Sequence, residues 1–137
     1  MNITICIDNN FIMQAVFLLT SIIHTNKNIP LTVFVFSENL NETSKNKLST
    51  ITENTNVNLV FKKIDLADLP PLPLKGKEHI TVATYYRLLI PYLLPEDVEK
   101  ILYLDCDMLV LDSITDFYNI DLSKTNVAAV IDMFSGY

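Results

Sequence analysis

The stretch that most constrains the fold lies at residues 100–111 and reads KILYLDCDMLVL. An apolar run leads into two acids, Asp105 and Asp107, and a second apolar run follows them. Aliphatic residues on both faces are typical of a buried strand in a parallel sheet that helices cover on each side. An ionised carboxylate is costly to bury unless a cation or hydrogen bonds compensate its charge. We therefore expect a cationic group to meet these two aspartates.

The spacing of the two acids favours a shared metal ion. On a strand, side chains two residues apart lie on the same face, about 6.6 Å from each other. Both carboxylates then lean toward one cation, while Cys106 points to the opposite face. The alternative is that Asp105 and Asp107 are solvated acids where a strand frays into a loop. The apolar residues directly after them argue against this alternative.

Composition excludes several classes of protein. Half of the 137 residues are hydrophobic and 19% are charged, which indicates one globular domain with a real core. A net charge of −6 with a single arginine argues against nucleic acid and anionic membranes as main partners. The longest apolar stretch is too short to span a bilayer, and we see no signal peptide. Cys6 and Cys106 are expected as small core residues of a cytoplasmic protein, not as a disulfide or a zinc site.

Glycine is rare, with only Gly76 and Gly136 in the chain. Neither a G-x-G-x-x-G turn nor a P-loop can therefore be present. If the protein binds a diphosphate, a metal ion and side chains must hold it, which agrees with the aspartate pair.

Alternating strand and helix patterns predict an α/β fold with one mostly parallel sheet and helices on both faces. Strands are expected at residues 2–7, 31–36, 57–64, 100–105 and 127–131. Helices are expected at residues 11–25, 42–55 and 81–94, the last with a kink or break at Pro91. Residues 65–79 contain too many prolines for a helix, and residues 112–120 are a short helix or a loop.

Polar side chains follow the first predicted strand, at the edge where open α/β folds bind ligands. They are Asp8, Asn9 and Asn10, and either asparagine can instead cap the helix that follows. Asp132 ends the strand predicted at residues 127–131 and adds an acid to the same edge. Arg87 stands on an otherwise apolar and aromatic helix, where it either pairs with a nearby carboxylate or binds a ligand.

Three segments together resemble one family: ICIDNNF near the start, TVATYYRLLIPYLL in the middle, and KILYLDCDMLVL followed by AAVIDM. They resemble family 8 of the retaining glycosyltransferases, which includes bacterial lipopolysaccharide glucosyl- and galactosyltransferases and glycogenin. The resemblance implies a Rossmann-like GT-A fold. It also implies transfer of a hexose from UDP-glucose or UDP-galactose to lipopolysaccharide or another cell-surface glycan, with retention of configuration.

The resemblance further implies a metal site. Asp105 and Asp107 match the D-x-D motif that holds Mn²⁺ against the diphosphate of the nucleotide-sugar. Oxygen ligands suit Mn²⁺ or Mg²⁺ rather than zinc.

Other residues are implied to contact the UDP-sugar donor. Asp8 and Asn10 match positions that contact the uridine, and Phe11 stands where the family often has an aromatic ring near the uracil. Arg87 matches an arginine that reaches the donor. Asp132 matches an acid near the donor sugar and is the candidate catalytic residue.

Part of the family pattern is missing from the sequence. The absent elements are the N-x-G segment, the second acidic region and the histidine of an H-x-x-G-x-x-K-P-like motif. Neither His24 nor His79 can replace that histidine. We therefore expect residues 1–137 to be the N-terminal nucleotide-sugar-binding part of one GT-A domain that is truncated at its C-terminus. Peripheral membrane contact would be compatible with the full-length protein.

Two other functions stay open at this point. One is a nucleotide- and metal-binding module without turnover. The other is a D-x-D phosphohydrolase of the haloacid dehalogenase type, whose motif usually lies on the first strand. Here about a hundred residues precede the motif, and Leu109 holds its last position, so the second alternative is disfavoured.

Overall fold

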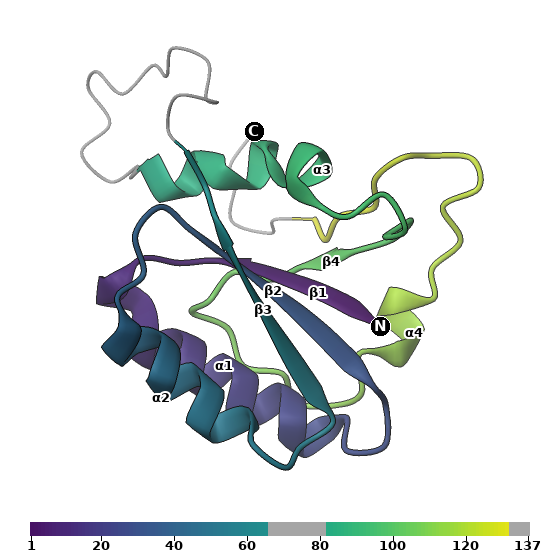
Figure 1. Ribbon diagram of the computed structural model, residues 1–137. Helices are drawn as coiled ribbons and strands as arrows, with labels where there is room; N and C mark the ends of the chain where they lie inside the picture. Colours follow the sequence, from purple (N-terminus) through teal and green to yellow (C-terminus); the bar gives the residue numbers. More distant parts are fainter. Residues whose placement is uncertain (66–81, 132–137) are drawn as a thin grey trace.

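A parallel sheet forms the centre of the computed structural model, which describes residues 1–65 and 82–131 (Figure 1). Its strands are β1 (Asn2–Cys6), β2 (Leu31–Ser37), β3 (Val57–Lys63) and β4 (Leu102–Tyr103), in the order β3-β2-β1-β4. All three neighbouring pairs are parallel. The predicted α/β class with a mostly parallel sheet is therefore confirmed.

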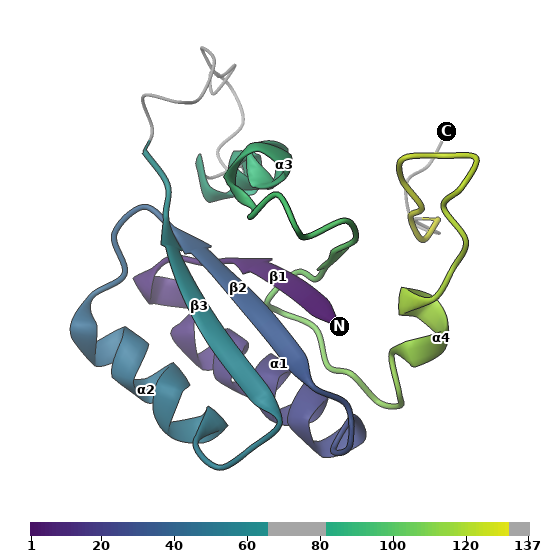
Figure 2. The ribbon, with the colours of Figure 1, turned by 45° about the vertical axis from the view of Figure 1, so that its right-hand side comes forward.

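Helices cover both faces of the sheet, as the sequence predicts (Figures 1 and 2). On one face lie α1 (Ile12–Thr25), which follows the 3₁₀ turn η1 (Asn9–Phe11), and α2 (Glu42–Thr52). On the other face lie the 3₁₀ helix η3 (Val82–Leu88) and the short helix α3 (Ile90–Leu93). A further short helix, α4 (Thr115–Tyr118), follows β4. No helix of the described residues is long and apolar enough to cross a membrane.

Strand alternation divides the apolar side chains into two cores. Successive residues of a strand point to opposite faces. Thus Ile3, Ile5 and Val33 pack in the core that contains α1, while Phe34 and Phe36 belong to the second core. The buried residues of α1 recur at helical spacing, and they complete the first core: Ile12, Ala15, Leu18, Leu19 and Ile22. The second core takes Tyr86, Leu89 and Ile90 from η3 and its continuation.

Residues 81–94 were expected to be one helix with a kink or break. The structure has η3 and α3 instead, and Pro91 lies in the first turn of α3. Proline is tolerated there because the first turn has no intrahelical partner for its missing N–H. The segment is thus interrupted as predicted, but the break lies at Leu89, two residues before Pro91, and the part before it is a 3₁₀ helix. Except for Asp65, the predicted loop at residues 65–79 lies outside the described residues.

The last predicted strand is wrong over its described residues. Residues 127–131 form no strand, and Val127, Val130 and Ile131 are exposed. β-branched residues fit a pleated surface only where a neighbouring strand pairs with them, and no strand of the described residues does so here. The apolar run at residues 108–111 is also mostly exposed rather than buried.

Candidate functional site

The parallel register of β1 and β4 brings two acidic turns to one edge of the sheet. Ile3 lies opposite Leu102 and Thr4 opposite Tyr103, so both strands end at the same edge. Asp8 follows the end of β1 by two residues, and Asp105 follows the end of β4 by two residues. The expected common edge for these two acids is therefore present. Asp132 lies outside the described residues, and its place at this edge stays a prediction.

The turn after β1 is held by side chains that bond to the backbone. Asp8 caps η1, since its Oδ1 accepts a hydrogen bond from the Asn10 backbone N–H at 2.7 Å. Asn9 ties this turn to the start of α2, because its Oδ1 accepts from the Asn41 N–H at 3.1 Å and from the Ser44 hydroxyl at 2.9 Å. The alternative that Asn9 or Asn10 caps the following helix does not hold, because the N-cap of α1 is Phe11 without a side-chain cap bond, and Asp8 caps only η1.

Asn10 and Phe11 complete this turn and are both exposed. Within the described residues, no hydrogen bond engages the side chain of Asn10. The ring of Phe11 is also open to solvent. Both side chains are therefore accessible to a ligand at the carboxyl edge of the sheet.

The turn after β4 has a cation and a tyrosine gathered on Asp105. Its Oδ1 accepts a hydrogen bond from Tyr103 Oη at 2.7 Å and another from Arg87 Nη2 at 3.3 Å. The Arg87 guanidinium lies over the Tyr103 ring, 4.9 Å from its centroid. The Arg87 and Asp105 side chains are 41% and 49% exposed. At such exposure an ion pair contributes at most about 1 kcal/mol to stability, so the arrangement is not mainly a stabilising device.

The prediction that Asp105 and Asp107 lie on a buried strand is wrong, and their exposure beyond the strand end matches the alternative of solvated acids. The ladder ends at Tyr103, so Asp105 and Asp107 lie beyond the strand and are exposed. The alternation of faces still extends as far as Cys106, which packs against the core on the α1 side, as expected. A cation does meet Asp105, and it is the guanidinium of Arg87. Of the two alternatives for that arginine, pairing with a carboxylate is the one the structure contains.

The donor set at this turn consists of carboxylate oxygens. Among the described residues, no group of three or more His, Cys, Asp or Glu side chains is placed to hold a metal ion. Two carboxylates nevertheless fit Mg²⁺ or Mn²⁺, because these ions usually keep water and substrate phosphates as further ligands. Asp105 and Asp107 are thus suitable partial ligands for a hard cation.

Both cysteines are free thiols next to this turn. Burial raises the pKa of the Cys6 thiol to about 12. The pKa of Cys106 is also raised, first by burial and then by the charge of Asp107. Thiols with raised pKa values are poor nucleophiles and poor metal ligands at neutral pH. This agrees with their expected role as small core residues.

Tyr103 and a second pairing of a tyrosine with an acid were not predicted from the sequence. Tyr86 donates to Glu38 Oε2 at 3.3 Å, which ties η3 to the end of β2. Burial, followed by the charge of Glu38, raises the pKa of Tyr86 to about 12. Burial also raises the pKa of Tyr103, followed by its hydrogen bond to Asp105. Strand alternation carried a signal for Tyr103, which is two residues before Asp105 and so shares its face.

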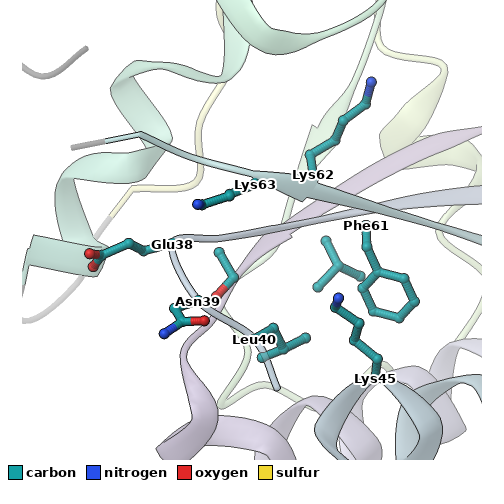
Figure 3. Close-up of a pocket in the computed structure, with 9 residues that line it drawn as sticks. Glu38, Asn39, Leu40, Lys45, Phe61, Lys62 and Lys63 are labelled. Carbon is teal, nitrogen blue, oxygen red and sulfur yellow. The ribbon is translucent and has the colours of Figure 1, made fainter. Parts of the chain in front are cut away.

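A separate pocket of about 230 Å³ lies at the carboxyl ends of β2 and β3 (Figure 3). It is lined by Val35, Ser37, Glu38, Asn39, Leu40, Lys45, Phe61, Lys62 and Lys63. Lys45 forms an ion pair with Glu42, with 2.7 Å between Nζ and Oε1. The side chain of Lys62 points away from the ring of Phe61 (Figure 3). The pocket includes none of the predicted site residues.

The geometry at this edge of the sheet defines a class of protein. A parallel sheet that gathers acids, an arginine and accessible side chains at its carboxyl edge is typical of α/β domains that bind ligands there. The chain belongs to glycosyl transferase family 8, whose family model matches residues 2–137. The predicted family and its GT-A fold are thereby confirmed.

Individual relatives agree with this assignment. The chain is 28% identical over 134 residues to general stress protein A of Bacillus subtilis, covering 96% of this chain and 46% of the relative. It is 25% identical over 130 residues to lipopolysaccharide 1,3-galactosyltransferase of Salmonella typhimurium, covering 95% and 38%. The structure of galactosyltransferase LgtC in complex with donor and acceptor sugar analogues superposes with a TM-score of 0.68 at 25% identity, covering 89% and 43%. The chain thus spans less than half the length of these relatives.

Proposed function

We propose that the chain is the N-terminal nucleotide-sugar-binding part of a retaining glycosyltransferase. The transferred sugar is a hexose, glucose or galactose, which passes from a UDP-sugar to lipopolysaccharide or another glycan. The observation that carries this proposal is the β1–β4 register, which puts the Asp105 turn beside the Asp8 turn at one sheet edge in a family 8 chain. A galactosyltransferase that acts on lipopolysaccharide is among the relatives.

In this proposal Asp105 and Asp107 hold Mn²⁺, with Mg²⁺ as the alternative. Asp105 Oδ1 accepts from Tyr103 and Arg87, and Oδ2 accepts no hydrogen bond from another described residue. That oxygen and the exposed carboxylate of Asp107 are therefore available to a cation. A metal ion held there would supply positive charge to offset the charge that grows on the diphosphate as the glycosidic bond breaks. The scarcity of glycine supports this role, since the chain has no glycine-rich loop to hold phosphates.

The remaining predicted residues bind the rest of the donor. Asp8 and Asn10 contact the uridine, and the exposed ring of Phe11 lies near the uracil. Arg87 reaches the donor from η3, on the same side of the sheet as Asp105. Asp132 acts near the transferred sugar.

We further propose that additional residues of a longer protein complete the metal shell and bind the acceptor. The expected location of that protein is the cytoplasm, with peripheral membrane contact where the acceptor is lipid-linked. Residues 1–137 alone should then bind UDP weakly, only with Mn²⁺, and transfer no sugar. Missing ligands and a missing wall of the cleft both reduce affinity.

Calorimetry of UDP binding to this chain, with and without Mn²⁺, tests the proposal. Asp105→Asn and Asp107→Asn should each weaken Mn²⁺-dependent binding at least tenfold, because a metal ligand loses its charge. Asp112→Asn is the matched control, since Asp112 is an exposed acid beyond the D-x-D turn. Mn²⁺-independent UDP binding, or unchanged binding in both variants, would show that the metal assignment is wrong. Transfer of a labelled sugar by the chain alone would contradict the expected need for further residues.

A further inference from the structure

Tyr103 connects the second apolar core to the acidic turn. It is the last residue of β4, and its backbone lies opposite Thr4 of β1. Its half-buried ring packs against the core that contains Phe34 and Phe36. Its hydroxyl group, in contrast, reaches Asp105. The hydroxyl is therefore presented from a fixed backbone and a packed ring.

The contacts of Tyr103 engage both charged groups of this turn. The hydroxyl donates to Asp105 Oδ1 at 2.7 Å, a short distance that is typical of an O–H bonded to an ionised carboxylate. The face of the ring lies 4.9 Å from the guanidinium carbon of Arg87, in the geometry of a cation–π contact. One side chain thus fixes the rotation of the carboxylate and the position of the guanidinium.

We propose that Tyr103 is a positioning residue of the donor site. Its hydroxyl occupies Oδ1 of Asp105 and so directs Oδ2 outward to the metal ion, while its ring holds Arg87 beside the same carboxylate. This inference rests on the proposed function, because it assumes that Asp105 binds the metal. Groups that hydrogen-bond to a metal ligand typically change metal affinity by 10- to 100-fold when they are removed.

The chain offers a matched pair of variants for the test. Tyr103→Phe removes the hydroxyl and keeps the ring, whereas Tyr103→Leu removes both. Tyr86→Phe is the control, because Tyr86 also donates its hydroxyl to a carboxylate, that of Glu38, outside the proposed metal site. Mn²⁺ affinity of the 137-residue chain, measured by electron paramagnetic resonance of the free ion, is the first measurement. We expect about a tenfold loss in Tyr103→Phe and a change of less than about twofold in Tyr86→Phe.

Arg87 supplies a second measurement that needs no metal. It is the only arginine of the chain, so its side-chain Nε–H group gives a single resonance in a ¹⁵N correlation spectrum. Tyr103→Leu should shift that resonance, since the ring current is lost, while Tyr103→Phe should shift it much less. The spectra also show whether each variant remains folded.

The outcomes separate this inference from the proposed function. If the wild-type chain binds Mn²⁺ and Tyr103→Phe binds it equally well, the positioning role is overturned and the metal site stands. If the wild-type chain binds no Mn²⁺, the metal site and the role of the hydroxyl are both overturned. An unshifted Arg87 resonance in Tyr103→Leu would overturn the role of the ring. An equal loss of Mn²⁺ affinity in Tyr86→Phe would also overturn the inference, because the effect would not be specific to Tyr103.

Discussion

The first 63 residues and residues 100–131 both contain long aliphatic runs, yet these runs are buried in the first region and largely exposed in the second. Ile3, Ile5 and Val33 are fully buried, whereas Leu111 is 88% exposed and Ile131 is 77% exposed. In the first region β1 pairs with β2 over five residues and β2 with β3 over seven, but β4 pairs with β1 over only two. Burial therefore follows the available strand and helix partners and not the local hydrophobicity alone.

The candidate site lies where these two regions meet. Asp8 and Asn10 belong to the packed first region, and Asp105 and Asp107 belong to the sparsely paired second region. Arg87 comes from η3, which lies between the two regions in the sequence, and it contacts Asp105. This division suggests that stability depends mainly on the first region, whereas binding of a ligand depends on both.

Substitution of one buried and one exposed leucine is the strongest test of that difference. Leu18 of α1 is fully buried, and Leu18→Ala should lower the free energy of unfolding by about 2–5 kcal/mol, because it leaves a cavity. Leu111→Ala makes the same chemical change in the second region and should alter it by less than about 0.5 kcal/mol. Urea unfolding followed by circular dichroism measures both values. Similar losses in the two variants would mean that residues 108–111 are packed in solution.

Cysteine reactivity compares the two regions without changing the chain, since Cys6 belongs to the first and Cys106 to the second. With its pKa raised to about 12, Cys6 has more than tenfold less thiolate at pH 8 than an ordinary thiol has. Iodoacetamide should therefore modify Cys6 more than tenfold more slowly in the folded chain than in urea-unfolded chain. The rate should rise with pH up to about 12, because the thiolate fraction of Cys6 increases until the pH reaches its pKa.

Peptide mass spectrometry separates the two sites of modification. Cys106 lies in a turn and should be modified before Cys6, although its own pKa is also raised. Modification of Cys6 first, or equal rates in the folded and unfolded chains, would contradict the burial of the end of β1.

The same difference explains which parts of the fold could be predicted from the sequence. The segments 2–7, 31–36 and 57–64 were located to within about a residue at each end, because their apolar residues have partners on both sides. The strand predicted at residues 127–131 was wrong, since its β-branched residues have no paired neighbour among the described residues. A local pattern records the preference of a segment, but pairing requires a second segment that the pattern does not contain.

The candidate site, like the fold, was predicted only in part. The parallel strand–helix pattern, with an acid soon after each of two strands, was sufficient to place Asp8 and Asp105 at one edge of the sheet. A cation at the D-x-D acids was expected, but the residue that provides it was not identified, because such contacts join distant segments. Arg87 is 18 residues from Asp105 in the sequence, and Asn9 bonds to Asn41 and Ser44 of another element. Such contacts become visible only after the elements are assembled.

The smallest expected effect concerns the ion pair at the border between the two regions. The guanidinium of Arg87 and a metal ion would compete for the charge of Asp105, although Arg87 also helps to bind the donor. Arg87→Gln should therefore strengthen Mn²⁺ binding in the absence of nucleotide by a few-fold, in keeping with an exposed ion pair worth at most about 1 kcal/mol. The same variant should weaken Mn²⁺-dependent UDP binding. Lys124→Gln is the charge-matched control, because it removes one positive charge from an exposed position and should change neither affinity. Weaker Mn²⁺ binding in Arg87→Gln without nucleotide would show that Arg87 supports the metal site instead of competing with it, and the border would then be preorganised before any ligand arrives.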